Sequence, residues 1–377
     1  MIVRILYVLF FVIALAGCSK INKAKDLLTK PSAQEIYKRD LNINDDLFNL
    51  WEIEKQNALV NDSLRIDLPY QESGRFFPKS FSVYSYLIEL HRGDLLTVAV
   101  KLDSSSSLTF IDVFSFQNSE FRHIHSSDFG KQHIDLEITE DHFYKVIVQP
   151  EIEASSHFNI KINRSPTYVF PVAGGKNHDA QSFWGAQRDG GKRSHEGVDI
   201  FAKRGTPVIA STAGRITYMG EKGLGGKQVW LRDQKRGQSL YYAHLDSISS
   251  ITKKSVKAGD TLGFVGNSGN AKTTPPHLHF GIYRSNLGAI NPYHFIEQNN
   301  KQLLQHKNFL QTQILGIVNQ NANLRNSNSL KNSEIIQKIS KGDTFQILGK
   351  TADWYHIKTS DSNNASFLHS SLATPMN

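Results

Sequence analysis

The chain has 377 residues, of which 39% are hydrophobic, and a formal net charge of +8. This length can form several modest cores, so two to three domains are expected. Its one cysteine, Cys18, excludes an intramolecular disulfide and a cysteine-rich metal site. Lys and Arg outnumber Asp and Glu from residue 166 onward, but they form no long basic run. The basic part therefore suits an anionic polymer, and nucleic acid is not expected as a partner.

The N-terminal residues predict export. Arg4 precedes the apolar run Ile5–Ala14, which is shorter than the 18 or more residues of a spanning helix and is typical of a signal peptide over residues 1–17. The following Leu15-Ala-Gly-Cys18 resembles the bacterial lipobox, which implies lipid attachment to Cys18 and a stable membrane anchor. Ser19 is not the aspartate that retains lipoproteins at the inner membrane of enteric-type bacteria. The resemblance therefore favours an envelope lipoprotein at the outer membrane, facing the periplasm.

Residues 18–60 are expected to form a tether with a short helix. In the segment Asp45–Ile53, the apolar residues Leu47, Leu50 and Trp51 are spaced i, i+3 and i+4, and acidic residues stand at its start. A tether of this kind would set the distance of the remaining chain from the bilayer.

Residues 61–165 predict an accessory β-sandwich, because apolar residues alternate with polar ones in several short runs. The runs are Tyr84/Tyr86/Ile88/Leu90, Leu96/Val98/Val100/Leu102, Ile134/Leu136/Ile138, Tyr144/Val146/Val148 and Phe158/Ile160/Ile162. The layout, including Leu68-Pro-Tyr70 and His91-Arg-Gly-Asp94, resembles the pre-peptidase sandwich domains found beside secreted proteases. Three histidines of this segment show no ligand pattern and are expected at the surface: His123, His125 and His133.

Residues 166–300 contain three short clusters whose histidines and aspartate could bind a metal or transfer protons. They are His195-Glu-Gly-Val-Asp199, Tyr242-Ala-His244-Leu245 and His277-Leu-His279. Side chains at i and i+2 of a strand share a face, so His277 and His279 can enter one cavity. Imidazoles and a carboxylate with one open position form the catalytic zinc arrangement. If Asp199 and two of the histidines bind a metal, two histidines remain beside it to transfer protons.

A second metal chemistry uses two histidines and one carboxylate, as in non-haem iron oxygenases. Those sites usually place the carboxylate two residues after a histidine, whereas Asp199 is four residues after His195. An iron triad would also leave two histidines without a role, and the predicted export argues against it.

The segment from about Tyr168 to Phe295 resembles the lysostaphin-type (LytM-like) zinc metallopeptidases, most of which cleave peptide bonds in bacterial cell-wall peptidoglycan. The matching stretches include Phe183-Trp-Gly-Ala-Gln-Arg-Asp-Gly-Gly191, His195-Glu-Gly-Val-Asp-Ile-Phe201, Arg204-Gly-Thr-Pro-Val208, Tyr241-Tyr-Ala-His-Leu245, Gly263-Phe-Val-Gly-Asn-Ser-Gly-Asn270 and Pro276-His-Leu-His-Phe-Gly-Ile282. The resemblance implies one zinc ion per chain bound by His195, Asp199 and His279, with His244 and His277 as the catalytic pair. It implies no further cofactor.

Residues 313–377 resemble the bacterial Src-homology-3-like domain, a small β-barrel common on wall hydrolases. The resemblance rests on Asn323-Leu-Arg325, Ile339-Ser-Lys-Gly-Asp-Thr-Phe345, Trp354-Tyr-His-Ile357 and Phe367-Leu-His-Ser-Ser371. Trp354 and Tyr355 could line a peptide or glycan groove, or they could belong to the core of the barrel.

Together these features predict a mainly β protein with a short N-terminal helical tether, a β-sandwich, a β-rich peptidase domain and a C-terminal barrel. The expected function is hydrolysis of peptide crosslinks in peptidoglycan by a zinc endopeptidase held to the membrane by a lipid anchor. Two alternatives stay open: a catalytically silent activator of a cell-wall amidase, and an envelope metalloprotease that acts on proteins. The sequence assigns no protein partner.

Overall fold

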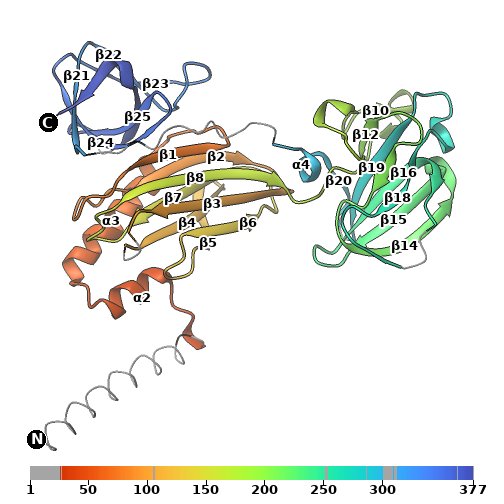
Figure 1. Ribbon diagram of the computed structural model, residues 1–377, viewed down its shortest axis with the longest axis horizontal. Coiled ribbons are helices and arrows are strands. Elements are labelled where there is room, and N and C mark those ends of the chain that lie inside the picture. Colours follow the sequence, from red (N-terminus) through yellow and green to blue (C-terminus); the bar gives the residue numbers. More distant parts are fainter. Residues whose placement is uncertain are drawn as a thin grey trace, which may run out of the picture.

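The computed structural model describes residues 26, 28–104, 107–250, 254–285, 287–299, 309, 312–362 and 364–376. Strands dominate and helices are few, which confirms the expected mainly β class. Figure 1 shows a central two-sheet sandwich, a small barrel over one end of it, and a separate β-rich body beyond the other end. We call these parts the sandwich (residues 61–165), the barrel (residues 312–376) and the site body (residues 166–299). The predicted signal peptide and Cys18 lie outside the described residues.

Two helices precede the sandwich: α2 (Ala33–Asp40) and α3 (Asp45–Asn61). The side-chain oxygen of Asn44 caps α3 by accepting hydrogen bonds from the first turn, where two acidic residues also favour a helix start. Within the described part of the chain, no helix has the length and apolar character needed to cross a bilayer.

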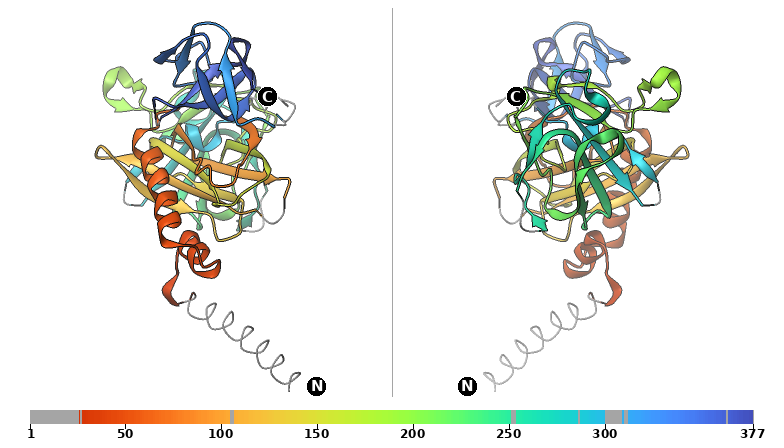
Figure 2. Two further views of the ribbon diagram at one scale, coloured as in Figure 1. Left: turned by 90° about the vertical axis from the view of Figure 1, so that its left-hand side faces the viewer. Right: turned by 90° about the vertical axis from the view of Figure 1, so that its right-hand side faces the viewer.

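These helices differ from the expected tether. α3 runs well past Ile53, because the residues that follow include good helix formers such as Glu54, Lys55 and Ala58. Trp51 is buried against Tyr37 of α2 and Phe110 of the sandwich. Both helices therefore lie on the sandwich and are part of the folded body, as Figure 2 shows in side view.

The sandwich consists of two antiparallel sheets. The first sheet has the order β1 (Tyr70–Arg75), β8 (His157–Pro166), β3 (Asp94–Leu102) and β6 (His133–Glu137). The second has the order β2 (Tyr84–Leu90), β7 (His142–Pro150), β4 (Thr109–Gln117) and β5 (Glu120–Ser126). The five alternating runs lie in β2, β3, β6, β7 and β8, whereas β1, β4 and β5 had no such signal. The three histidines expected at the surface are exposed.

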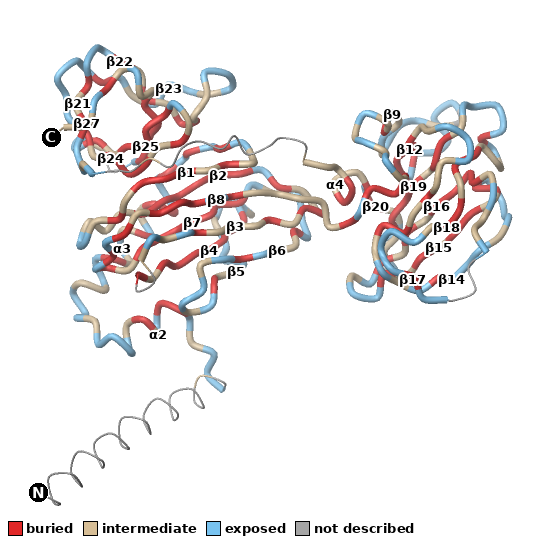
Figure 3. Tube along the Cα trace, viewed as in Figure 1, coloured by how far each residue is buried: buried red, intermediate tan, exposed pale blue. Residues whose placement is uncertain are grey.

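The barrel is continuous with the first sheet of the sandwich. Its strands are β21 (Leu315–Val318), β22 (Ala322–Arg325), β23 (Ile335–Ile339), β24 (Thr344–Thr351), β25 (Trp354–Thr359), β26 (Ala365–His369) and β27 (Ala373–Pro375). Strand β24 pairs with β1, so both parts share one 11-stranded sheet. Trp354 and Tyr355 are both buried, which makes them core residues and not groove residues. Figure 3 shows buried segments in the sandwich and in the adjoining barrel strands.

The site body is built on a second large sheet with its own apolar core. Its path order is β17 (Ser255–Val256), β14 (Gly214–Glu221), β15 (Lys227–Asp233), β16 (Gln238–Ile248), β19 (His277–Arg284), β12 (Val198–Phe201) and β9 (Ala180–Ser182), with β13 (Pro207–Ile209), β18 (Thr261–Val265) and β20 (Gly288–Ile290) paired beside it. A separate hairpin is formed by β10 (Gln187–Arg188) and β11 (Arg193–Ser194). The short helix α4 (Tyr293–Ile296) leads back toward the sandwich.

Candidate active site

Strand β19 brings the predicted site residues together, because it lies between β12 and β16. His279 pairs directly with Asp199 of β12 and with Ala243 of β16, the residue before His244. His277 and His279 are two residues apart on β19 and face the same cleft, as the H-x-H spacing predicted. The cleft has a volume of about 610 Å³, and Asp199 and the four predicted histidines, His195, His244, His277 and His279, all line it.

Three donor atoms converge at the floor of this cleft. Asp199 Oδ1 lies 3.0 Å from His195 Nε2 and 2.9 Å from His279 Nδ1, and the two imidazole nitrogens are 3.0 Å apart. Among the described residues these three form the only group of histidine, cysteine or acidic side chains close enough to share an ion. His195 and Asp199 are buried, so few water molecules compete for these atoms.

The proton arrangement at His195 favours a cation among these atoms. Its Nδ1 lies 2.9 Å from the carbonyl oxygen of Phe183, which can only accept, so Nδ1 carries the proton of the neutral ring. In that form the lone pair of Nε2 is directed at the carboxylate of Asp199, so a cation between the two atoms would be bound by both. Two imidazoles and a carboxylate in this arrangement fit a divalent ion such as zinc.

The pKa values agree with a ligand role. Burial would raise the pKa of Asp199, but its contacts with His195 and His279 outweigh this and hold the pKa far below its ordinary value. Burial lowers the pKa of His279. Near neutral pH the carboxyl group is therefore ionised and the imidazole of His279 is neutral, which are the forms that bind metals.

Gly197 allows the histidine and the carboxylate to approach closely. A Cβ atom at this position would lie 2.6 Å from Cε1 of His279 and 2.6 Å from the carbonyl oxygen of Phe280. Any side chain there would displace the β19 strand that carries His279. The glycine between His195 and Asp199 is thus required by the packing of the site.

His244 and His277 lie beside this group with matching hydrogen bonds. The Nδ1 of His244 is 3.0 Å from the carbonyl oxygen of Ser268, and that of His277 is 2.9 Å from the carbonyl oxygen of Pro275. Each Nδ1 therefore carries a proton, which leaves Nε2 of each neutral ring as an acceptor. Burial lowers the pKa of His244 to about 4, with nearby His279 and His277 adding to the effect.

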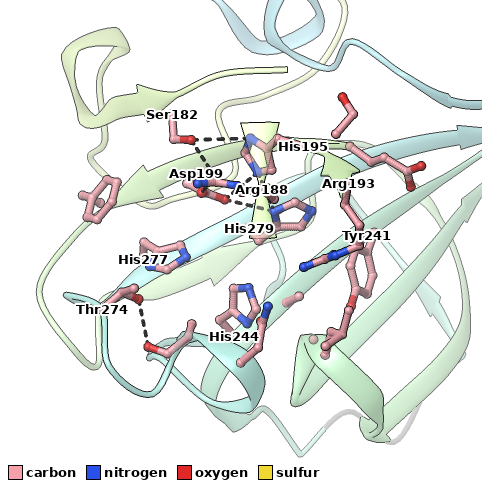
Figure 4. Close-up of a pocket in the computed structure, with 18 of the residues that line it drawn as sticks. Ser182, Arg188, Arg193, His195, Asp199, Tyr241, His244, Thr274, His277 and His279 are labelled. Atoms are coloured by element: carbon pink, nitrogen blue, oxygen red, sulfur yellow. Dashed lines mark hydrogen bonds and ion pairs between the residues drawn. The ribbon is translucent and has the colours of Figure 1, made fainter. Parts of the chain in front are cut away.

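His244 also has a left-handed backbone, with φ of 64°. Such a conformation is uncommon outside glycine and recurs at functional sites, where the surrounding structure holds it. Here the pairing of β16 with β15 shifts register between Tyr242 and Leu245, the stretch that contains His244. The irregular backbone turns the ring of His244 toward the cleft, as Figure 4 shows.

Arg188 is a site residue that the sequence reasoning missed. Its guanidinium group donates to Asp199 Oδ2 at 2.6 Å and to the hydroxyl of Ser182 at 2.6 Å. Since Oδ1 of Asp199 faces the two imidazoles, Arg188 fixes the other oxygen and so the orientation of the carboxylate. The residue lies within a stretch that carried the family resemblance, but no sequence pattern linked it to Asp199.

Comparison with known proteins identifies two regions of the chain. Residues 193–292 match the profile "Peptidase family M23", and residues 320–371 match "Bacterial SH3 domain". The L-Ala–D-Glu endopeptidase of Bacillus subtilis (strain 168) is 36% identical over 127 residues, which is 32% of this chain and 39% of that protein. The DD-carboxypeptidase/endopeptidase Mpg of Neisseria meningitidis serogroup B is 42% identical over 100 residues, which is 26% of this chain and 22% of that protein.

Among solved structures, the catalytic domain of the antimicrobial peptidase lysostaphin from Staphylococcus simulans is similar to part of this chain. It is 34% identical, and the match covers 30% of this chain and 89% of that domain with a TM-score of 0.28. The match to the two curated relatives spans less than half of the length of each.

Proposed function

We propose that this chain is a zinc-dependent endopeptidase that hydrolyses peptide crosslinks of bacterial peptidoglycan, because residues 193–292 match the profile of peptidase family M23. His195, Asp199 and His279 would hold one zinc ion, and His244 and His277 would transfer protons. The observation that carries the proposal is the convergence of Nε2 of His195, Oδ1 of Asp199 and Nδ1 of His279 within 3.0 Å of one another. The two further histidines line the same cleft.

A zinc ion in such a site lowers the pKa of a bound water and polarises the scissile carbonyl. The chain itself would supply proton transfer through the imidazole rings of His244 and His277. Nε2 of either His244 or His277 can accept a proton from the attacking water, because Nδ1 of each ring already donates to a backbone carbonyl. The protonated ring can then donate to the leaving amine. Arg188 keeps Asp199 oriented throughout, since it binds the oxygen that faces away from the imidazoles.

The bacterial SH3 domain and the basic charge of the chain support peptidoglycan as the substrate class. Two relatives suggest which bonds to test. One is named for the L-Ala–D-Glu bond and the other for DD-endopeptidase activity. A lipoprotein with Ser19 after its acylated cysteine implies an envelope with two membranes, where crosslinks typically join D-alanine to diaminopimelate. We therefore propose the crosslink as the substrate and the L-Ala–D-Glu bond as the second candidate.

The other two functions have less support. A silent activator of an amidase would not need the complete set of donor atoms found here. A protease acting on general proteins would not explain the bacterial SH3 domain. The anchor and the outer-membrane location rest on Cys18 and its surrounding sequence, and they remain proposals. Loss of membrane fractionation in the Cys18→Ala variant would support the anchor.

The metal proposal is tested by metal analysis of the full chain without its lipid anchor. About one zinc per chain is expected. The His279→Ala variant should lose it, whereas His244→Ala and His277→Ala should keep it and lose turnover by about 10²- to 10⁴-fold. His178→Ala is the matched control, because His178 is an exposed histidine of the same body that does not line the cleft. Full zinc in His279→Ala would refute the ligand assignment.

The substrate proposal is tested by mass analysis of digested sacculi. Conversion of crosslinked dimers to monomers supports the crosslink as the substrate. Glycan strands that keep only L-alanine would support the second candidate. Release of intact stem peptide would indicate amidase activity or its activation, and unchanged sacculi together with cleavage of a protein would support the protease function.

A further inference from the structure

We infer that the site body binds a sugar of the glycan strand on a row of aromatic side chains that runs from the cleft to the edge of its sheet. The row consists of Tyr218, Trp230 and Tyr241, and the ring of Tyr283 packs beside it. This inference rests on the proposed function and adds a second contact for the substrate, away from His279. The four aromatic residues lie outside the proposed ligand and proton-transfer sets.

The row is formed by direct cross-strand partners. Tyr218 of β14 pairs with Trp230 of β15, and Trp230 pairs with Tyr241 of β16. Tyr241 in turn pairs with Gly281 of β19, two residues after His279. Side chains of direct partners share one face of a sheet, so the three rings continue the face that carries His279. Figure 1 shows these four strands side by side.

The apolar core is complete without these rings. Leu231 and Leu240, the chain neighbours of Trp230 and Tyr241, are fully buried on the opposite face of the sheet. Tyr218 is 37% exposed, and Trp230 and Tyr241 are partly exposed. The solvent side of an antiparallel sheet is ordinarily polar, so a row of aromatic rings on it indicates an interaction site.

The inner rings of the row hold one another in place. The ring centroid of Trp230 lies 4.4 Å from that of Tyr241 and 5.1 Å from that of Tyr283. The indole nitrogen of Trp230 donates to Gln228 Oε1 at 3.0 Å, and the hydroxyl of Tyr283 donates to Glu196 at 3.4 Å. Rings that are fixed before binding lose little conformational entropy when a ligand packs on them.

The row is also continuous with the cleft. Tyr241 lines the cleft, and its ring centroid lies 5.8 Å from that of His279. Figure 4 shows Tyr241 beside His279, on the side away from His277. A substrate held at His279 can therefore extend over the row while it stays on the protein surface.

A pyranose ring matches this surface in shape and polarity. One face of such a ring carries C–H groups that can pack on an aromatic ring, and its edge carries hydroxyl and acetamido groups. The neighbouring row of the same sheet face is polar, because Arg232 of β15 pairs with Arg215 of β14 and with Ser239 of β16. Arg232 donates to the hydroxyl of Ser239 at 3.4 Å, and a guanidinium group has five donors in all. Aromatic rings beside hydrogen-bond donors fit an N-acetylated sugar better than a fully apolar ligand.

The length of the row matches the length of a stem peptide. Neighbouring strands lie about 4.8 Å apart, so β14 is about 14 Å from β19, three strands away. In a wall crosslink the scissile bond follows the fourth residue counted from the sugar, and four extended residues span about 13–14 Å. A crosslink held at His279 thus brings its sugar to Tyr218 and Trp230. A bond only one residue from the sugar would bring the sugar to Tyr241 instead.

The test compares two crosslinked muropeptide dimers, one that carries its disaccharides and one from which they have been removed. The zinc-loaded full chain without its lipid anchor should cleave the sugar-bearing dimer with a kcat/KM about 10-fold higher, the size of effect expected from one stacked ring. Tyr218→Ala should remove most of this preference by slowing the sugar-bearing dimer alone, and Tyr218→Phe should keep it. Met219→Ala is the matched control, because Met219 is 38% exposed on the same strand but points to the other face.

A binding measurement separates this inference from the proposed function. Calorimetry with a peptide-free tetramer of N-acetylglucosamine reports sugar binding even if the chain cleaves neither dimer. Binding that weakens about 10-fold in Tyr218→Ala and is unchanged in Met219→Ala supports the inference in either case. Equal cleavage of the two dimers overturns it, as does a loss in Tyr218→Ala that is equal for both dimers. The inference is also wrong if the tetramer does not bind at millimolar concentration, or if its binding is the same in Tyr218→Ala.

Discussion

The sandwich meets its two neighbours through junctions of opposite character. Toward the barrel, strand β1 pairs with β24, and side chains of the barrel belong to the same apolar core as those of the sandwich. These barrel residues are Leu348, Trp354, Ala365 and Phe367. Toward the site body, ion pairs cross the junction: Arg164 of the sandwich binds Glu297, and Arg236 of the site body binds Glu137.

The two junctions also differ in how far their ionisable side chains are buried. At the barrel junction, Glu72 of β1 and His356 of β25 are both fully buried and 2.9 Å apart, and Tyr70 and Tyr86 donate to the same carboxylate. At the other junction, Glu137 and Lys235 remain in contact with solvent. A buried pair loses stability when one member is removed, whereas an exposed pair contributes little.

This difference indicates that the barrel is a structural part of the sandwich and that the site body is a separate cooperative unit. A bacterial SH3 domain at the end of a chain would otherwise be treated as a module to be deleted. Here deletion of residues 313–377 would uncover the sandwich core. Activity lost by such a truncated chain would therefore report unfolding as much as lost wall binding.

The largest expected effect comes from truncating a large side chain in the apolar core that the sandwich and the barrel share. Phe367→Ala should cost about 3–5 kcal/mol, since Phe367 is fully buried, and should lower the melting temperature of sandwich and barrel together by roughly 6–20 °C. Scanning calorimetry with saturating zinc should show the transition of the site body unchanged. Phe280→Ala, an equally buried phenylalanine of the site body, is the matched control and should shift only the other transition. A barrel that melts separately from the sandwich would contradict the comparison.

A smaller effect is expected at the buried contact between Glu72 and His356. Glu72→Gln keeps the shape of the side chain but replaces one carboxyl oxygen with an amide group that cannot accept, so the contacts with His356, Tyr70 and Tyr86 cannot all be kept, which should cost about 2–3 kcal/mol. Denaturant unfolding monitored at the sandwich should detect it. An unchanged free energy of unfolding would mean that the pair does not stabilise the junction.

The sequence could not show this junction, because strand β1 has no apolar alternation. Its residues Tyr70–Arg75 read as a polar stretch, yet four of the six are buried between β8 and β24. Strand β4 escaped prediction for the opposite reason. Helices cover its outer face, where Phe110 meets Trp51, so nearly every residue is buried and no period of two remains. Alternation of apolar and polar residues identifies strands that have one face exposed to solvent, and neither β1 nor β4 has such a face.

The site was more predictable than the fold around it. The five histidine and aspartate positions came from short motifs, and the structure brings them into one cleft. The contact of Arg188 with Asp199 and the positive φ of His244 depend on the hairpin and on the irregular β16 ladder. Both arise from pairing between segments distant in the chain, which local residue patterns do not encode.

The third prediction tests the junction between the sandwich and the site body at Gly93. Gly93 has φ of 102°, and a Cβ atom there would lie 2.6 Å from the ring of Phe295 and 2.8 Å from its backbone nitrogen. Gly93→Ala should loosen the docking of the site body and cost about 1–2 kcal/mol. Hydrogen exchange at the residues around α4 should rise while the sandwich core stays protected.

Gly130→Ala is the matched control for backbone strain. Gly130 also has positive φ, at 75°, but nothing lies within 4 Å of the Cβ that would be added. If both variants change exchange around α4 equally, strain alone explains the effect, and Gly93 has no role in docking.

The smallest effect is expected at Glu137. Burial would raise its pKa, but the hydrogen bonds from Lys235 and Arg236 outweigh this and lower it. A carboxyl group with a lowered pKa stabilises the folded state above its unfolded pKa of about 4.3, and this contribution disappears as the pH falls through the folded value. Since much of the group is solvated, Glu137→Gln should cost less than about 1 kcal/mol at neutral pH and low salt. The cost should shrink in 1 M salt and vanish in acid.

Paired unfolding measurements at pH 7 and pH 3 would check the sign of this effect. Glu140→Gln is the control, because Glu140 is an exposed residue of the sandwich whose carboxylate contacts His142 and lies outside this junction. A loss of more than about 2 kcal/mol in Glu137→Gln that persists in 1 M salt would require a desolvated pair. The junction with the site body would then resemble the one with the barrel, and the two bodies would be expected to unfold together.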